Sequence, residues 1–490
     1  MVRHPGGALL AMISLDQGSS VPLYRQLVSQ LRQAINARQV AHGTRLPSSR
    51  QLAKELGVSR LTILSAYEQL MGEGYLEARI GSGTYVGRPI EIGEEGAEQA
   101  KSRAPAPLKE LLSSRGRQIL KSVGALQPSR PNSFRPGVPA LDAFPMRLWT
   151  RLTNRRLRTA EHEMLTYGAR EGYGPLREAI ARHLRDARMI DCDAAQIIVL
   201  GGSQRAFLHV AWTLLEVGDP VWFEDPGYHV ARDAMAAAGA RIEPVPLDGE
   251  GLDIRRGEAD CSLPKAIYVT PAGQLPLGNT MSLDRRRELL AFAQKNRAWI
   301  IEDDFNGEHR YLGRPLPALQ TLDSKGCVLH IGSFSKTLFP ALRLGYLVAP
   351  HHLIEVFSAA ATLVDIAAPT LPQAVLADFI SEGHLQSHLR RMRSLYARRQ
   401  RLLVEALQER LGGFLEVEPV EAGMHLVAWL PEGQDDRVAS CRARARGIDA
   451  LPLSSYSLHP LRPGLLIGFA CVECEQIVPG VRRLAEALTG

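Results

Sequence analysis

The segment from Leu329 to Tyr346 could carry covalent chemistry at a single lysine. In it an apolar run ends in Ser333 and Ser335, Lys336 follows, and Arg343 comes seven positions later. A lysine held at the end of a strand can form a Schiff base with an aldehyde cofactor, and hydroxyl and guanidinium groups beside it can hold a phosphate. A lone Ser-x-Ser-Lys more often marks a surface lysine beside a strand. The rest of the chain therefore has to decide between the two interpretations.

Two further groups fit such a cofactor. The segment Gly201-Gly202-Ser203-Gln204 opens a predicted helix, where backbone N–H groups and the helix dipole favour a phosphate. A plain strand-to-helix turn is the simpler explanation of these glycines taken alone. Asp303 follows another apolar run, and a carboxylate there could keep a pyridine nitrogen protonated, which makes the ring an electron sink. Together with Lys336, these groups predict one cofactor site.

All of these groups follow predicted buried strands. The chain beyond residue 140 alternates strand and helix patterns, and the predicted strands cover residues 197–200, 221–224, 266–270, 299–302 and 328–332. That alternation predicts an α/β domain with a mostly parallel sheet and helices on both faces. Ligands of such sheets bind at the carboxyl ends of the strands, where the candidate residues lie.

The N-terminal part of the chain carries most of the positive charge. The formal net charge is +6, and residues 1–88 hold ten Lys and Arg against five Asp and Glu. A polyanion is therefore the expected partner of this end.

Apolar spacing in the same region predicts a winged helix-turn-helix. The first helix runs from Pro22 to near Arg38, a second runs from Ser48 or Ser49 to Leu56, and a third runs from Arg60 to Gly74. In the third helix the predicted inward stripe is Leu61, Leu64, Tyr67 and Leu70. Two short strands around Gly81-Ser82-Gly83 would form the wing. The alternative is a small helical domain with no role in nucleic-acid binding.

This region resembles the winged helix of GntR-type bacterial regulators. The matching segments are Leu46-Pro47-Ser48-Ser49-Arg50, Leu52-Ala53, Leu56-Gly57-Val58-Ser59-Arg60, Tyr67, Leu70, Gly74-Tyr75-Leu76 and Gly81-Ser82-Gly83-Thr84. The resemblance implies contacts to double-stranded DNA at three places. Arg45, Ser48 and Arg50 would contact the DNA backbone. Ser59, Arg60 and Thr62 would enter the major groove, and Gly83 and Thr84 would reach the minor groove.

The large domain resembles the fold-type I aminotransferases that use pyridoxal 5′-phosphate, and the whole chain resembles the MocR/GabR-type branch of GntR regulators. The segments that carry this resemblance are Tyr167, Gly172-Tyr173-Gly174-Pro175-Leu176-Arg177, Gly202-Ser203-Gln204, Glu224-Asp225-Pro226-Gly227-Tyr228, Thr270-Pro271, Glu302-Asp303-Asp304, Gly332-Ser333-Phe334-Ser335-Lys336-Thr337-Leu338-Phe339-Pro340 and Arg343-Leu344-Gly345-Tyr346.

The resemblance implies a role for eight residues at the cofactor. Lys336 would form the Schiff base, and Asp303 would pair with the pyridine nitrogen. The phosphate would be held by Ser203, Gln204, Ser333 and Arg343. Tyr228 would lie over the ring, and Tyr167 would reach the phosphate of the neighbouring subunit in a head-to-tail homodimer.

The expected organisation has three parts. They are a winged helix-turn-helix domain at residues 12–88, a flexible linker at 89–131 with a local helix between Leu108 and Leu120, and an aminotransferase-like domain at 132–490 that ends in a small α+β subdomain. Either Met1 or Met12 could be the start of the chain.

Three departures from the aminotransferase pattern bear on function. Phe305 stands where the family has a tyrosine that bonds the cofactor phenolate, and Gly273 replaces a histidine. Leu466 stands where amino-acid-handling relatives have a carboxylate-binding arginine. Burying a carboxylate without a cation costs several kcal/mol, so an amino-acid effector is disfavoured unless Arg462 or His459 takes that role.

Composition and cysteine usage narrow the setting. The chain has 490 residues, of which 45% are hydrophobic and 22% charged, which is typical of a soluble globular protein with two or three domains. No apolar run approaches the roughly 18 residues of a membrane span. Six scattered cysteines favour the reducing cytoplasm. Cys471 and Cys474 form a CxxC without a second ligand pair near them in the sequence, so no metal site is predicted.

The preferred hypothesis is a transcriptional regulator that depends on pyridoxal 5′-phosphate, and that senses this cofactor itself or an amine or amino acid. Transamination would be weak or absent. The alternative is a working aminotransferase with an accessory DNA-binding domain. A third hypothesis, a scaffold without catalysis, requires that Lys336 carry no cofactor.

Overall fold

The chain divides into two compact units, Met1–Leu111 and Leu112–Gly490. The computed structural model describes residues 13–79, 81–87, 112–122, 130–160, 162–313, 316–365 and 367–489. The expected domain limits at Met12 and Arg88, and most of the expected linker 89–131, lie outside these ranges. From the linker the structure describes the helix α7 (Ser114–Ser122), which starts later than the predicted helix at 108–120.

The first unit has the predicted helix-turn-helix and wing. Its elements are α2 (Leu23–Asn36), α3 (Ser49–Leu56), α4 (Arg60–Gly72), β1 (Leu76–Arg79) and β2 (Gly83–Val86). Ser48 and Ser59 begin α3 and α4 because their side chains accept hydrogen bonds from the backbone N–H groups of Gln51 and Thr62. Gly57 ends α3 in the left-handed conformation, at φ 65°. The wing strands pair antiparallel.

The predicted inward face of α4 is wrong at one end. Leu61 is 72% exposed and Leu64 only half-buried, whereas Ile63, Ala66 and Leu70 are fully buried and Tyr67 is nearly so. Since α4 begins only at Arg60, residue 61 lies in its first turn at the surface, and the buried stripe starts two residues later.

The second unit is built on an eight-stranded sheet, which confirms the predicted α/β class. Its strand order is β3 (Ile197–Leu200), β10 (Gly345–Val348), β9 (Val328–Ser333), β8 (Trp299–Asp304), β7 (Ala266–Val269), β4 (Pro220–Asp225), β5 (Arg241–Asp248) and β6 (Gly251–Leu252). The pairings from β9 through β5 are parallel, while β10 runs antiparallel to both of its neighbours. All five predicted strands are present: the one at 197–200 has the predicted ends, and the ends of the other four differ by at most two residues.

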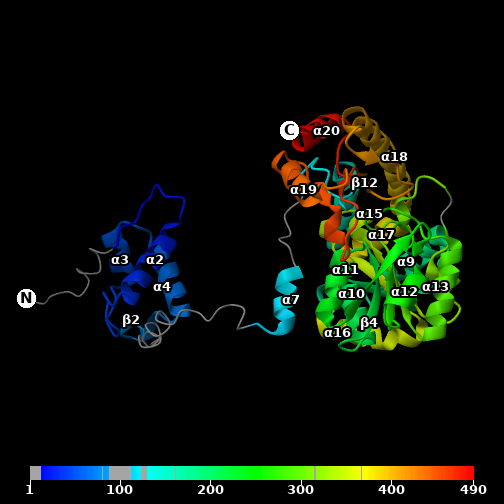
Figure 1. Cartoon of the computed structure of the whole chain (residues 1–490). Coiled ribbons are helices and arrows are strands. Elements are labelled where there is room, and N and C mark those ends of the chain that lie inside the picture. The colour runs from blue at the N-terminus through cyan, green and yellow to red at the C-terminus, as the bar shows by residue number, and fades with distance from the viewer. Residues whose placement is uncertain are drawn as a thin grey trace, which may run out of the picture. The chain divides into compact units, whose positions relative to one another are not determined.

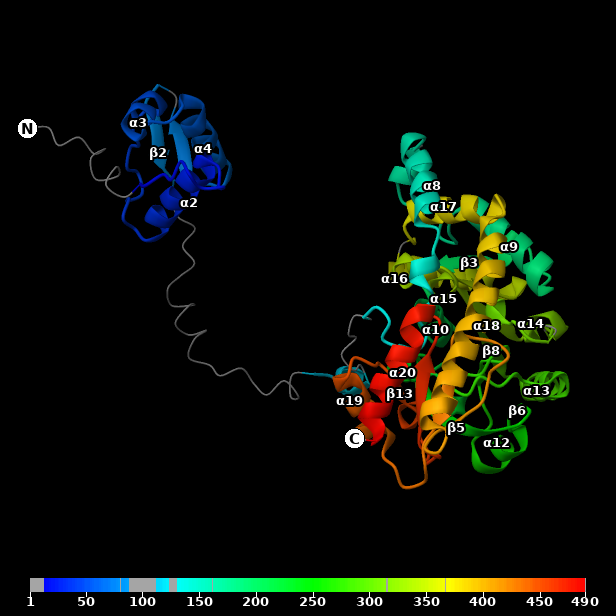
Figure 2. The ribbon, with the colours of Figure 1, turned by 90° about the horizontal axis from the view of Figure 1, so that it is seen from above.

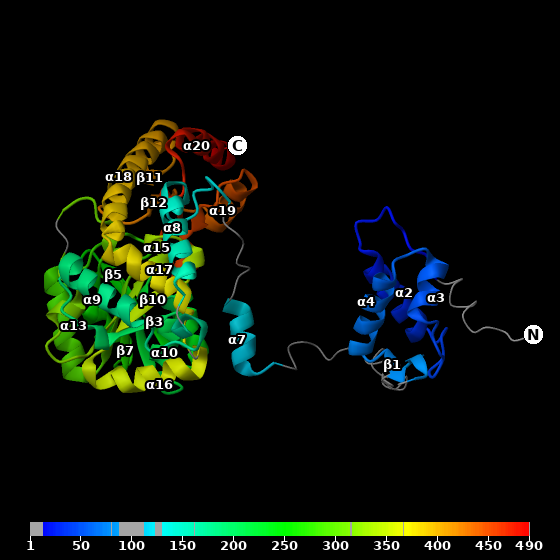
Figure 3. The same cartoon turned by 180° about the vertical axis from the view of Figure 1, so that it is seen from behind.

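Helices cover both faces of this sheet, as Figures 1 and 3 show from opposite sides. On one face lie α10 (Ser203–Leu214), α11 (His229–Ala238) and α16 (Ile354–Asp365). On the other lie α12 (Ile254–Asp260), α13 (Leu283–Asn296) and α14 (Leu319–Leu322), with α9 (Gly174–Arg188) and α17 (Thr370–Ser381) towards β3. The short helices α8 (Met146–Arg158) and α15 (Phe334–Thr337) join the α9 side.

A smaller subdomain with its own core follows, as predicted. It holds the strands β11 (Glu416–Val417), β12 (His425–Trp429), β14 (Gly464–Gly468) and β13 (Leu451–Pro452), in that order, and the helices α18 (His384–Leu411), α19 (Asp436–Ala445) and α20 (Cys474–Thr489). Figure 2 shows α18 and α20 lying side by side. Phe134, from before the sheet domain, is buried in this core, so the chain near residue 134 joins the two parts.

None of the helices in the described ranges combines the length and the apolar character that crossing a bilayer requires.

Candidate functional site

Lys336 lies at the carboxyl end of β9, on the short helix α15. Its Nζ donates a hydrogen bond to the carbonyl oxygen of Gly137 at 2.8 Å. Desolvation lowers the pKa of Lys336, with opposing contributions from Asp303, which raises it, and Arg135, which lowers it further. Lower basicity favours the neutral amine, the form of a lysine that reacts with aldehydes.

Asp303 lies on β8, the strand next to β9, and is 3% exposed. Its Oδ2 accepts a hydrogen bond from the Tyr268 hydroxyl at 2.6 Å, while its Oδ1 has no partner among the described residues. Burial raises the pKa of Asp303 to about 7. A buried carboxylate with one free oxygen suits a cationic N–H donor, such as a protonated pyridine nitrogen.

Five of the eight predicted cofactor residues line one pocket, namely Lys336, Asp303, Ser203, Tyr228 and Ser333. The other residues of its wall are Pro136, Gly137, Leu275, Phe305, His425 and Tyr456. The structure therefore brings together, from segments far apart in the sequence, an amine, a buried carboxylate and the three hydroxyl groups of Ser203, Tyr228 and Ser333.

The remaining three predicted residues do not line this pocket. Gln204 follows Ser203 in the first turn of α10. Arg343 is exposed, and its backbone is in the left-handed conformation at φ 51°. Burial raises the pKa of the Tyr228 hydroxyl, and the positive charge of Arg343 acts to lower it. Tyr167 is 83% exposed. Its predicted contact with a neighbouring subunit is not tested by a single chain.

A close backbone approach holds the 202–203 turn against the sheet. A Cβ on Gly345 would lie 2.9 Å from the carbonyl oxygen of Gly332 and 3.1 Å from the backbone nitrogen of Ser203. Any larger residue would push β10 away from this turn. Gly345 thus fixes where Ser203 stands relative to Ser333.

Two buried histidines position the lysine turn. The ring of His309 bonds the Lys336 carbonyl at 3.4 Å, and the ring of His388 bonds the Thr337 carbonyl at 3.2 Å. Burial lowers the pKa of both histidines to about 4, so both are neutral and act as N–H donors. These contacts fix the backbone of α15 from outside the pocket.

His425 and Tyr456 belong to the pocket but were not predicted from the sequence. Nε2 of His425 bonds the Pro276 carbonyl at 3.2 Å, and burial lowers its pKa to about 4. Because a carbonyl only accepts, Nε2 carries the hydrogen and Nδ1 is left as an acceptor. Both residues come from the small subdomain, roughly a hundred residues after Lys336 in the chain, and no local motif marks them.

The three departures from the aminotransferase pattern have a clear setting in the structure. Phe305 lines the pocket and presents only apolar atoms there. Leu466 is fully buried in an apolar cluster with Leu453 and Tyr456. Gly273 lies beside Asn306, whose Cβ would be 3.4 Å from a Cβ at position 273.

Both residues named as possible substitutes for the missing arginine already have partners. Arg462 pairs with Glu416 at 2.6 Å and lies over the Trp429 ring. The Nδ1 of His459 pairs with Asp225 at 2.7 Å. This geometry gives no support to a substitution by either residue.

The predicted DNA-contacting residues gather around α3, α4 and the wing. Six are exposed and two, Thr62 and Thr84, are half-buried; the exposed ones are Arg45, Ser48, Arg50, Ser59, Arg60 and Gly83. The Arg45 guanidinium lies close to Gly83, since a Cβ there would be 3.1 Å from its Nε. Ser48 and Ser59 also have a purely structural role as helix caps.

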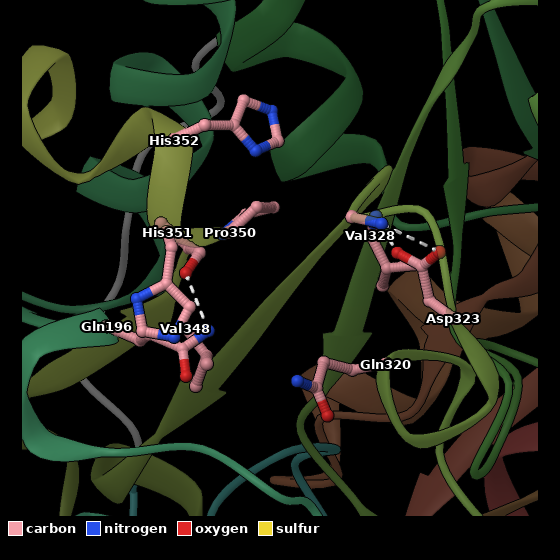
Figure 4. A pocket seen from close by; sticks show the side chains of 10 residues that line it. Gln196, Gln320, Asp323, Val328, Val348, Pro350, His351 and His352 are labelled. Atoms are coloured by element: carbon pink, nitrogen blue, oxygen red, sulfur yellow. Dashed lines mark hydrogen bonds between the residues drawn. The ribbon is translucent and has the colours of Figure 1, made fainter.

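A second cavity of about 250 Å³ lies at the opposite end of the sheet, near the start of β9, and is larger than the lysine pocket. Figure 4 shows its polar side chains, including those of Gln196, Asp323 and His351. The Asp323 carboxylate is already occupied by backbone N–H groups, among them that of Val328 at 2.8 Å, and Gln196 bonds the Ala349 carbonyl. Chemistry, rather than size, identifies the lysine pocket as the functional site.

Comparisons with known proteins agree with this architecture. A family model for aminotransferase class I and II matches residues 140–479, and one for bacterial regulatory proteins of the gntR family matches residues 23–86. The chain is 39% identical over 478 residues to the probable rhizopine catabolism regulatory protein MocR of Rhizobium meliloti, covering 97% of this chain and 96% of that protein. It is 31% identical to the HTH-type pyridoxine biosynthesis transcriptional regulator PdxR of Corynebacterium glutamicum, covering 91% of each.

Among solved structures, the chain is similar to the multiple substrate aminotransferase of Thermococcus profundus. The identity is 30% and the TM-score 0.68, with coverage of 78% of this chain and 98% of that one. It is also similar to the alpha-aminoadipate aminotransferase LysN of Thermus thermophilus, complexed with N-(5′-phosphopyridoxyl)-L-leucine, with 27% identity and a TM-score of 0.69, over 80% of this chain and 98% of that one.

Replacing Asp303 with Asn should remove one contribution to the pH dependence of the free energy of unfolding. The pKa of Asp303 is about 7 in the folded, cofactor-free protein, against roughly 3.9 for an unfolded chain. Between roughly pH 4 and 7 the folded state thus keeps a proton that the unfolded state loses, so the free energy of unfolding falls as pH rises. Denaturant titrations at both ends of this window should show wild type losing stability relative to Asp303→Asn towards pH 7. An equal difference at both ends would contradict this.

Proposed function

We propose that this chain, which belongs to the MocR-type branch of the gntR family of bacterial regulators, is a DNA-binding transcriptional regulator controlled by a small molecule at a pyridoxal 5′-phosphate site. One observation carries the proposal: a lysine pocket of the aminotransferase kind and a winged helix-turn-helix are parts of one chain. A DNA-binding domain contributes nothing to transamination, whereas it supplies the output of a sensor.

The cofactor is pyridoxal 5′-phosphate, and the pocket residues fit it. Asp303 offers a buried acceptor with one free oxygen, and Lys336 offers a primary amine of lowered pKa. When bound, the cofactor supplies an aldehyde that condenses reversibly with primary amines, and a chromophore. In the proposed arrangement four residues of the same chain hold the phosphate, namely Ser203, Gln204, Ser333 and Arg343. Tyr167 of the partner subunit also reaches it, and Tyr228 covers the ring.

DNA is bound by the first unit. Its exposed residues would divide into backbone contacts from Arg45, Ser48 and Arg50, major-groove contacts from Ser59, Arg60 and Thr62, and minor-groove contacts from Gly83 and Thr84. We propose the domain limits 12–88 for this part, 89–131 for the linker and 132–490 for the sensing part. The charge excess of residues 1–88 supports a polyanionic partner.

The pocket favours binding over turnover. The phenyl ring of Phe305 cannot donate a hydrogen bond to the cofactor, and Leu466 offers no cation to a substrate carboxylate. Without the hydrogen bond at position 305, the acid–base behaviour of the site changes. Without a cation at position 466, the substrate carboxylate is positioned less firmly. The signal is therefore the cofactor itself, or a primary amine or amino acid that reacts with it.

Loading with pyridoxal 5′-phosphate should change DNA affinity through Lys336. We expect the wild type to change its affinity for the intergenic DNA beside its own gene by at least about fivefold on loading, the lower end of common allosteric couplings. Lys336→Ala should bind that DNA with one affinity, with or without the cofactor. A mobility-shift titration at fixed salt measures this.

Two matched variants make that experiment specific. Lys325→Ala removes an exposed surface lysine and should behave as wild type. Arg60→Ala changes the first residue of α4. This variant should no longer shift the mobility of the DNA, while it still binds the cofactor. Equal DNA binding by loaded and cofactor-free wild type would refute the proposed sensing.

A working aminotransferase remains the alternative, because the pairing of Lys336 with a buried Asp303 on the neighbouring strand is retained. We expect the cofactor absorbance to change once on addition of an amino donor, with no steady turnover when an oxo-acid acceptor is also present. Sustained formation of the new amino acid, abolished in Lys336→Ala, would favour the enzyme instead.

The active form is a homodimer in the cytoplasm, arranged head to tail. Several large apolar side chains before α9 and on α16 are exposed in the single chain, namely Met146, Leu157, Leu165, Tyr167 and Leu363. Leu363 is 89% exposed and Leu165 78%, values that are costly for leucine in water. A partner subunit would cover them and would bring its Tyr167 to the neighbouring pocket.

A charge placed on that surface should break the dimer. Leu363→Asp should weaken self-association by about tenfold or more, because an unpaired carboxylate would be buried at the interface. Light scattering over a concentration series gives the dissociation constant. The control, Leu263→Asp, alters a leucine that is 62% exposed elsewhere on the unit. A Leu363→Asp protein that dimerises as wild type does would contradict the proposed interface.

A further inference from the structure

Arg135 directly precedes Pro136 and Gly137, two residues that line the lysine pocket. Within the described residues its side chain makes no hydrogen bond and no ion pair, although its backbone carbonyl accepts from Cys471. An arginine that is half-buried and unpaired is unusual, because its five donors lose water contacts without replacing them. Such a group is a candidate to bind an anion that arrives from outside.

The chain around Arg135 is fixed on both sides. Phe134 is 2% exposed in the core of the small subdomain, and its carbonyl accepts from Gly468 at 2.8 Å. Pro136 and Gly137 form part of the pocket wall, and the Gly137 carbonyl holds the Lys336 amine at 2.8 Å. Arg135 therefore stands on a short, rigid bridge whose next two residues already touch the cofactor pocket.

The charge of Arg135 is felt inside the pocket. It lowers the pKa of Lys336, on which Asp303 is the other charged group that acts within the described residues. It also lowers the otherwise raised pKa of Tyr456, which lines the same pocket. Two residues on different walls thus sense this one cation.

The position of the missing aminotransferase arginine, and the two described residues that could have replaced it, offer no free cation. Leu466 is fully buried among apolar side chains, Arg462 pairs with Glu416, and His459 pairs with Asp225. The pocket lining itself contains one lysine, which the cofactor occupies, and one neutral histidine. Of these basic groups, only Arg135 is free to bind a carboxylate.

We propose that Arg135 binds the carboxylate of an amino-acid effector, and so takes the role that Leu466 cannot fill. The proposal rests on the proposed function, since the effector amine must reach a cofactor at Lys336. It names the effector class: a small primary amine with a carboxylate near it, gripped from the 134–137 bridge rather than from β14. Arg135 is a binding residue here, with no part in bond making.

Matched pairs of ligands test this directly. Full-length, cofactor-loaded protein is titrated with glycine and methylamine, leucine and 3-methylbutylamine, and phenylalanine and 2-phenylethylamine. The readouts are the change in cofactor absorbance and the shift of the unfolding temperature. We expect at least one amino acid to bind about tenfold or more tightly than its amine, the size of a charge-assisted hydrogen bond. Arg135→Gln should abolish that preference, and Arg135→Lys should keep part of it.

The control is Arg462→Gln, which removes a surface arginine of the same subdomain and should keep the wild-type preference. Both proteins are saturated with pyridoxal 5′-phosphate before the titration, because removing Arg135 also raises the pKa of Lys336 and so can change the affinity for the cofactor itself. An Arg135→Gln protein that keeps the preference, or a wild type without any preference in all three pairs, would overturn the proposal. A wild type that takes up no cofactor would instead be a failure of the proposed function.

Discussion

A carboxylate buried without an ion-pair partner in the described part of the chain is the constraint on which the rest of the site depends. Asp303 is almost fully enclosed, has one oxygen bonded to Tyr268 and leaves the other unsatisfied. Such a group is costly until a cationic donor meets it. The cofactor-free protein thus stores a penalty that a protonated pyridine ring would relieve, which makes the site selective for a ligand of that kind. Because cofactor binding would relieve this cost, it would also raise the free energy of unfolding of the protein.

The sheet explains how two such reactive groups come together. Asp303 pairs with Ile331 across the parallel strands β8 and β9, so both strands end at the same edge, with Lys336 on the turn that follows β9. The carboxylates on either side of Asp303 on β8 both have partners: Glu302 bonds the His330 ring, and Asp304 bonds Arg188. Asp303, whose charge has no ion-pair partner among the described residues, is therefore held between residues whose charges are satisfied. Because these neighbours fix the backbone in advance, little of the free energy of cofactor binding is lost in reorganising it.

The sequence predicted what local patterns specify and missed what distant segments supply. The strands, the helix caps Ser48 and Ser59, and the grouping of Lys336 with Asp303 could be predicted because strand ends share an edge and caps are local. Gly137 and His425 could not be, since they meet Lys336 only after the small subdomain packs on the sheet domain. The misplaced Leu61 reflects the uncertain first turn of a helix, where periodicity alone does not fix which residue faces inward.

The same packing changes what the departures from the aminotransferase pattern mean. Read along the sequence, Leu466 removes a carboxylate site, and the natural conclusion is an effector without a carboxylate. In three dimensions the bridge at 134–137 carries a guanidinium without a partner among the described residues, on Arg135, directly before two residues of the pocket wall, and its charge lowers the pKa of Lys336. A cation moved from β14 to this bridge would hold a carboxylate against the segment that fixes Lys336 through Gly137. A ligand gripped there acts on the junction between the sheet domain and the small subdomain, which is where a sensor would need to detect it.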